Sequence, residues 1–155
     1  MKILPINLTK LKEVSFEPKK EPWNEYRLED DSILRFRTIA VKFFDTGEVD
    51  PLSGCPNYIV AHQNILSVIS DKRGEPLEPP KNIAEIPDDK KKEINIVETI
   101  KEDWNVYIVD EKYMYEMKPY IVAVYRLEGY FDISGYPIYH VRSQNISRIK
   151  KLKID

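Results

Sequence analysis

The sequence repeats itself at a spacing of 81 residues, and this repeat restricts the fold more than any other feature. Segments 16–65 and 97–146 align without a gap and share 15 identities in 50 positions. Both tryptophans and both glutamines of the chain fall at matching positions: Trp23 with Trp104, and Gln63 with Gln144. Matches of such rare residues indicate two copies of one small unit rather than two unrelated β-hairpins of similar composition.

The strongest repeated stretch reads Ser-Gly-x-Pro-x-Tyr-x-Val-x-x-Gln-Asn-Ile, and it begins at Ser53 and again at Ser134. We expect Gly54 and Gly135 to adopt positive φ angles in a tight turn, after which the proline starts a returning strand. For the Gln-Asn pairs we expect a capped kink in the chain, with contact to a ligand or a base as the alternative. The asparagines of this kink, expected in the left-handed region, are Asn64 and Asn145.

Each tryptophan opens its repeat at the place where a core would be sealed. We expect Trp23 and Trp104 to be buried aromatic plugs, with an exposed stacking platform as the alternative.

Runs of β-branched and aromatic residues predict the same strands in each copy. These strands are 24–28, 33–44, 58–62 and 65–69 in the first copy, and 105–109, 114–125, 138–142 and 146–149 in the second. In the long strand, Leu34 and Phe36 take the inward phase first, and Ile39, Val41 and Phe43 take it later. This change of phase predicts a bend or bulge near Thr38, where the second copy has Pro119.

A long bent strand after a tight acidic turn resembles the architecture of small SH3-like or Sm-like barrels. We therefore predict a mainly β fold, a tandem duplication of a small SH3-like β-barrel module, with the two copies packed in pseudo-twofold symmetry. Units of about 55 residues are marginally stable alone, which favours a shared apolar face. The predicted divisions are an N-terminal extension at 1–13, module one at 14–70, a proline-rich charged linker at 71–93 and module two at 94–155. Within the linker, a short helix from about Asp88 toward Ile100 is an alternative to coil.

Composition narrows the cellular setting. The 32% of charged residues nearly cancel to a net charge of −2, so the chain lacks the global basic field of many nucleic-acid binders. A single cysteine cannot form an internal disulfide, and the sequence contains neither a signal-peptide pattern nor an apolar run of about 20 residues. We therefore expect a cytoplasmic protein without a membrane partner, and the scarcity of glutamine and cysteine points to a thermophilic source.

Catalytic patterns are weak. His62 and His140 fall at positions that do not match each other, and neither has a second histidine or a cysteine at ligand spacing. Asp30 and Asp31 occupy a predicted tight turn, where a solvated role is expected. The sequence carries no phosphate-binding glycine loop and no nucleophile elbow. We therefore predict no enzyme activity, no metal and no cofactor, while an enzyme would need a deep pocket around one of the histidines.

The prediction that remains is a binding or assembly module, acting through an unknown protein partner or through self-association. The alternative is single-stranded nucleic-acid binding by the second copy, which has most of the tyrosines and a basic C-terminal tail. The candidate surface for this alternative consists of Tyr130, Tyr136, Arg142, Arg148, Lys150 and Lys151.

Overall fold

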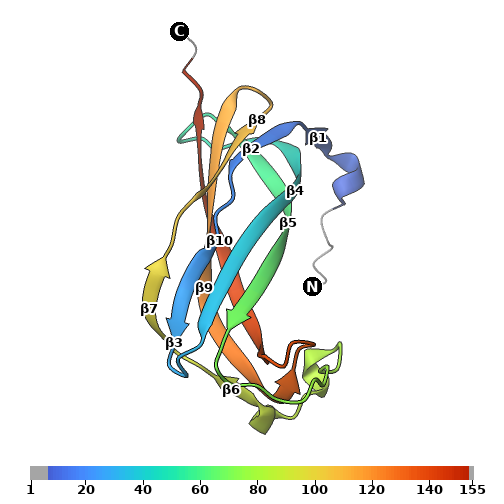
Figure 1. Cartoon of the computed structure of the whole chain (residues 1–155). Helices are drawn as coiled ribbons and strands as arrows, with labels where there is room; N and C mark the ends of the chain where they lie inside the picture. The colour runs from blue at the N-terminus through green and yellow to red at the C-terminus, as the bar shows by residue number, and fades with distance from the viewer. Residues whose placement is uncertain (1–6, 154–155) are drawn as a thin grey trace.

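The computed structural model describes residues 7–153, and its strands form two five-stranded antiparallel sheets (Figure 1). The first sheet consists of β1 (Lys12–Val14), β3 (Asn24–Leu28), β4 (Ile33–Val49), β5 (Pro56–Ile69) and β7 (Ile96–Lys101). The second consists of β2 (Phe16–Lys20), β6 (Lys91–Glu93), β8 (Asn105–Val109), β9 (Tyr113–Phe131) and β10 (Pro137–Lys151). Three single 3-10 turns, η1 (Leu8–Lys10), η2 (Ile83–Glu85) and η3 (Asp88–Lys90), are the helical segments of this region. The predicted mainly β class is confirmed. Residues 1–6 of the predicted N-terminal extension lie outside the described part.

The two sheets have the same strand order. In the first sheet, β4 pairs with β5 along one side and with β3 and β1 along the other, and β3 pairs further with β7. In the second sheet, β9 pairs in the same way with β10, β8 and β6, and β8 pairs with β2. Segments that match at the 81-residue spacing therefore occupy corresponding places. The expectation of closed barrels is corrected, because within residues 7–153 both sheets stay open.

The chain exchanges one strand in each direction between the two sheets. β2 precedes β3 in the chain but pairs with β8 in the other sheet, where Phe16 lies opposite Val109. β7 precedes β8 but pairs with β3, where Ile96 lies opposite Leu28. The division into modules 14–70 and 94–155 stays a prediction. Each sheet contains one strand that comes from the other side of this division.

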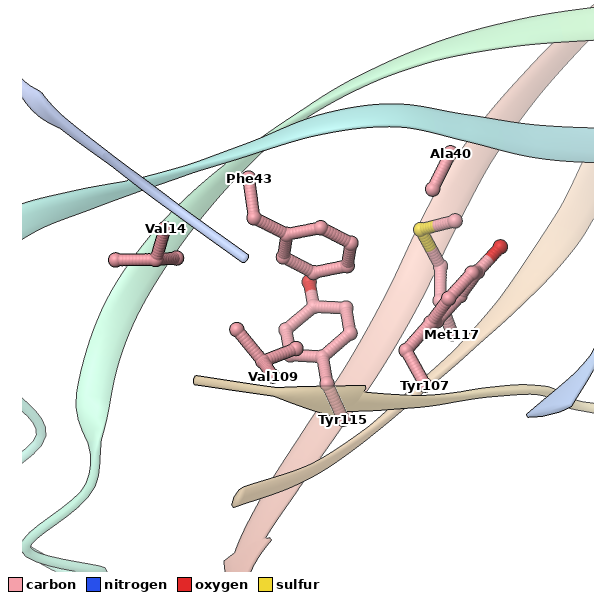
Figure 2. Packing of buried hydrophobic residues seen from close by; sticks show 7 residues of the cluster. All are labelled: Val14, Ala40, Phe43, Tyr107, Val109, Tyr115 and Met117. Carbon is pink, nitrogen blue, oxygen red and sulfur yellow. The ribbon is translucent and has the colours of Figure 1, made fainter. Parts of the chain in front are cut away.

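Each of the two hydrophobic clusters draws on both sheets. The first cluster consists of Val14, Ala40 and Phe43 from one sheet and Tyr107, Val109, Tyr115 and Met117 from the other (Figure 2). The second consists of Leu28, Leu34, Ile94, Val124 and Tyr139. Phe43 meets Tyr115 edge to face, with ring centroids 5.2 Å apart. Because residues of both sheets close each cluster, neither half of the chain contains a complete core.

Matched polar residues join the two halves where the strands cross over. The Tyr26 hydroxyl donates a hydrogen bond of 2.8 Å to Glu102, and the Tyr107 hydroxyl donates one of 2.7 Å to Glu21. Burial, together with the hydrogen bond to the carboxylate, raises the pKa of both tyrosines above the ordinary value. These reciprocal bonds explain why both residue types recur at the repeat spacing.

The Gln-Asn pairs do not kink the chain, contrary to the prediction. β5 and β10 each run without interruption through this pair. Asn64 and Asn145 are absent from the residues with positive φ, which among the described non-glycine residues are Asp31, Asp110 and Glu111. Thr38 donates a 2.8 Å hydrogen bond to the Asn64 side chain, so the amide is satisfied within a regular strand. The glycine prediction is confirmed, with φ of 72° at Gly54 and 83° at Gly135.

The predicted bulge exists but lies three residues further along the strand. The pairing register shifts between Ala40 and Lys42, which leaves Val41 as the bulged residue. Val41 was expected to point inward and is instead 45% exposed. The Glu21 carboxylate accepts a 2.9 Å hydrogen bond from the Ala40 amide at this bulge. Thr38, where the bulge was predicted, is fully buried in the regular ladder.

The connector contains no long helix. The 3-10 turn at Asp88–Lys90 is followed at once by β6 and then by β7. The helix considered as an alternative to coil does not form, because these residues complete the two sheets, β6 by pairing with β9 and β7 by pairing with β3.

We predict that neither half of the chain folds alone. Fragments 1–78 and 79–155 should each lack a cooperative urea transition by circular dichroism, because each would lose one side of both clusters. Mixing the fragments should restore the transition. As a control, the folded chain cleaved at an inserted protease site after Glu78 should remain a complex. A fragment that unfolds cooperatively by itself would contradict the shared-core arrangement.

Candidate functional site

The surface of the first sheet that faces away from the core carries a row of repeat-matched side chains. Leu34, Phe36, Thr38 and Ala40 alternate inward along β4, so the residues between them point outward. Directly paired residues share a face, which places Ile65 beside Arg37 and Gln63 beside Ile39. We call this surface outer face A; it consists of Trp23, Arg35, Arg37, Ile39, Val41, Gln63 and Ile65.

The second sheet presents a corresponding surface. Tyr115, Met117 and Pro119 point inward along β9, so the intervening residues point outward. β10 contributes the residues paired with them. We call this surface outer face B; it consists of Trp104, Glu116, Lys118, Tyr120, Val122, Gln144, Ile146 and Arg148.

The tryptophans are half-buried at the edge of these faces, beneath cationic side chains. The Arg35 guanidinium lies 4.5 Å from the centre of the Trp23 ring, and the Arg148 guanidinium lies 4.0 Å from that of Trp104. A cation over an indole ring is an attractive arrangement that also fixes the ring. Both expectations hold in part. Each ring is half-buried, as a plug would be, and lies at the edge of an outer face, as a platform would, with one side covered by a charged residue.

The matched apolar residues of both faces are open to solvent. Val41 and Val122 are 45% and 51% exposed, and Ile65 and Ile146 are 37% and 48% exposed. Tyr120 on face B is 55% exposed. Core packing therefore does not account for the identity of these residues between the repeats. At the hairpin tips, the aliphatic residues Leu52 and Ile133 also fall at matching positions and are 96% and 94% exposed.

The six candidate residues from the sequence do not form one surface. Arg142, Arg148 and Lys150 alternate along β10 and point to the side of outer face B, and Lys151 ends the strand. Tyr130 and Tyr136 lie at the opposite end of the β9–β10 hairpin. At ~3.3 Å per residue, about 45 Å of strand separates Tyr136 from Lys150.

Local partners already occupy several of these candidates. The Arg73 guanidinium lies 4.6 Å from the centre of the Tyr136 ring and donates a 2.9 Å hydrogen bond to its hydroxyl. Lys90 lies 5.9 Å from the centre of the Tyr130 ring. Arg148 forms an ion pair of 3.0 Å with Glu116. The basic tail expected from the sequence is largely the end of β10, which continues to Lys151.

Sequence reasoning missed the rest of the outer faces. Val41 and Ile39 were expected to point inward, toward the core. Arg37, Tyr120 and Val122 were not singled out as candidate site residues. The signal that could have found them is the set of matches themselves, because Gln63 and Gln144 are too polar for a core and share a face with these residues.

A buried ion pair ties the first sheet to the second near the β3–β4 turn. Arg126 contacts the Asp30 carboxylate at 2.8 Å, and the Asp30 side chain is only 4% exposed. Tyr139 and the Ser32 amide donate hydrogen bonds to the same carboxylate. Burial by itself raises the pKa of Asp30, but the hydrogen bonds from Tyr139, Ser32 and Arg126 outweigh it and hold the pKa below its ordinary value. The solvated role expected for Asp30 is therefore wrong, while Asp31 is exposed, as a turn residue should be.

Three of the clefts in the described surface lie beside repeat-matched tyrosines and beside His140. Two clefts of about 330 and 360 Å³ occupy matching places between β5 and β10, one beside Tyr58 and the other beside Tyr139. A wider cleft of about 520 Å³ lies beside His140 and is lined mainly by residues of the connector, which include Pro79, Pro80, Ile83 and Ile86. Cys55 is buried. Within residues 7–153, no group of three or more His, Cys, Asp or Glu side chains is placed to hold a metal ion.

Comparison with protein-family models, with curated proteins and with solved structures gives no match to this chain. Over the described residues, no helix has the length and apolar character needed to cross a bilayer.

We predict that Asp30→Asn destabilises the protein by about 2 kcal/mol at pH 7, because it removes the charge that accepts hydrogen bonds from Tyr139, Ser32 and Arg126 and leaves Arg126 with Glu128 as its carboxylate partner. Asp30 has a lowered pKa in the folded state, so its contribution is present above the ordinary carboxyl pKa and is lost as pH falls through the folded value. Urea unfolding should therefore show the difference between variant and wild type shrinking below about pH 4.

The neighbouring substitution Asp31→Asn is the matched control, because Asp31 is exposed and asparagine tolerates its φ of 66°. It should change the free energy of unfolding by less than about 0.5 kcal/mol. Equal effects of the two substitutions would show that the buried pair does not stabilise the contact between the sheets.

Proposed function

We propose that this protein is a non-enzymatic binding or assembly module, built by internal duplication, that binds a partner protein at each of its two outer faces. The observation that carries the proposal is the identity of solvent-exposed residues between the repeats. Val41 and Val122, with Ile65 and Ile146, are identical although neither pair is needed to fill a core. Two copies of one recognition surface account for this identity, since both would meet the same ligand.

The chemistry of the faces favours a protein over a small molecule. Tryptophan, tyrosine and arginine are the residues that most often dominate binding energy at protein interfaces. Each face combines a cation-covered tryptophan with two exposed aliphatic side chains on a broad sheet surface. Small-molecule sites, in contrast, are concave and enclose most of the ligand.

Charge pairing on the faces also favours a protein over nucleic acid. Arg35 pairs with Glu25 at 3.2 Å, Lys118 with Glu102 at 3.1 Å, and Arg148 with Glu116 at 3.0 Å. Cations that already have carboxylate partners contribute less to phosphate binding, which depends on releasing counterions from the backbone. The exposed apolar area thus remains the main source of affinity.

Two matched faces on opposite sheets suit bivalent binding, in which one chain connects two partner molecules. The cytoplasmic and thermophilic assignments belong to this proposal and follow from composition alone.

We predict two equivalent sites per chain for a ligand selected from a peptide display library on the whole protein. Calorimetric titration should give two ligands per wild-type chain, and Val41→Glu or Val122→Glu should each leave one. The double variant should bind at least about 30-fold more weakly, which corresponds to the roughly 2 kcal/mol of a central interface residue.

The control is Val97→Glu, since Val97 is 59% exposed on β7 and belongs to neither face. It should leave the stoichiometry at two. A ligand that binds once per chain, or that ignores both valine substitutions, would contradict the proposal.

One observation keeps single-stranded nucleic acid as the second candidate. Arg142, Arg148 and Lys150 point to the side of outer face B, which also carries Trp104 and the exposed Tyr120. Basic residues interleaved with aromatic rings are typical of single-strand binders.

If this candidate is right, fluorescent single-stranded DNA or RNA should bind with a steep loss of affinity as salt rises. The variant Arg142→Ala, Arg148→Ala, Lys150→Ala should flatten that salt dependence by up to three units of slope. The variant Arg35→Ala, Arg37→Ala on outer face A should not. Absence of micromolar binding at low salt removes this candidate and leaves the protein partner.

A further inference from the structure

β5 is a long edge strand whose outer side is unpaired. It pairs with β4 from Ile69, opposite Ile33, to Pro56, opposite Val49, and with no other described strand. One side-chain contact of 3.4 Å, between His62 and Asn145, joins it to β10. An edge strand exposes a row of backbone N–H and C=O groups that can pair with another chain. Natural proteins usually protect such edges with charged residues, prolines or bulges.

β5 lacks this protection, whereas the other sheet edges have it. Its fourteen residues, Pro56–Ile69, contain no Lys, Arg, Asp or Glu. The matching strand β10 carries Arg142, Arg148, Lys150 and Lys151. Of the remaining edges, β2 contains Pro18, Lys19 and Lys20, and β7 contains Glu98 and Lys101 and is bulged beside Val97.

The two strands differ at matching positions, which makes the contrast informative. Arg142, Arg148 and Lys150 of β10 correspond to Ala61, Ser67 and Ile69 of β5 at the 81-residue spacing. Ile69 is 54% exposed. The fold therefore accepts charged residues at these positions, and β5 has small or apolar ones instead.

We propose that β5 pairs with β5 of a second copy of this chain, antiparallel and across a twofold axis, so that the first sheets of two molecules become one continuous sheet. Such a contact is isologous, meaning that the same strand serves both sides. Because β5 is uncharged along its length, self-pairing brings no charge against an apolar residue and no like charges together. A strand from a charged partner would leave its charges beside Ile65 and Ile69.

The arrangement also explains why assembly ends at two copies. Each chain has one unprotected edge, and that edge is consumed by the pairing. The basic residues of β10 and the proline and lysines of β2 prevent further strand addition.

The test is the mass of the whole chain by sedimentation equilibrium over a range of concentrations. The wild type should approach twice the 18.3 kDa of one chain. The variant Ala61→Arg, Ser67→Arg, Ile69→Lys, which gives β5 the side chains that β10 has at the matching positions, should remain at the mass of one chain. Its dissociation constant should rise by roughly 100-fold or more, because like charges would lie close across the paired strands.

A control variant places the same number of charges on exposed apolar residues outside β5: Leu52→Arg, Leu77→Lys and Val97→Arg. It should dimerise as the wild type does. Thermal unfolding checks that both variants are folded, and none of these positions belongs to outer face A or outer face B. Failure of dimerisation and failure of ligand binding are therefore separate results.

Amide hydrogen exchange of the wild type gives a second measurement that needs no variant. Protection of β5 should increase with protein concentration, while protection of β10 should not. The proposal is overturned by a wild type that stays at 18.3 kDa up to millimolar concentration, by a dimer that survives the charges in β5, or by protection of β5 that does not depend on concentration.

Discussion

The exchange of β2 and β7 between the sheets is the constraint on which the rest of the structure depends. Each strand leaves its own unit and completes the other, so the hydrogen bonds from Tyr26 to Glu102 and from Tyr107 to Glu21 can form only when both halves are present. The two hydrophobic clusters follow from the same exchange, because each lies between the sheets. A small unit that cannot bury enough surface alone thus gains a complete core.

The residues that the two repeats share divide into groups, and each group recurs for a different physical reason. Glutamate, asparagine and tyrosine recur at the crossover because they bond across it. Glycine recurs in the hairpin loop because the turn needs a positive φ. Tyr58 and Tyr139 recur because they pack against the two clusters. Among the matches that these causes leave unexplained, Val41, Val122, Ile65 and Ile146 are exposed and lie on the two outer faces.

Local pattern was enough to predict some elements and not others. The strands at Asn24–Leu28 and Asn105–Val109 match the predicted bounds, because their inward residues alternate without interruption. β2 and β7 were missed since they are mostly exposed and gain their stability from partners far away in the chain. The outer faces were missed for a related reason: a single bulge reverses which side of the sheet a valine occupies. The candidate tyrosines and lysines were grouped because both types are frequent in the second copy, but the structure places Tyr130 and Tyr136 at the opposite end of the β9–β10 hairpin from Lys150.

The differences between the halves are as informative as the identities. Asp30 and Arg126 form a buried ion pair at one end of the molecule, and the position that matches Arg126 in the first repeat is Asp45, which cannot form the same pair. β10 carries basic residues where β5 has none. If both β5 and β10 were open edges, each molecule could add another molecule at either edge, and the chains would form a fibre. With one open edge per molecule, assembly ends after a single contact. In the proposed dimer, matched faces combined with unmatched edges would let one chain present the same surface twice and still limit its own assembly.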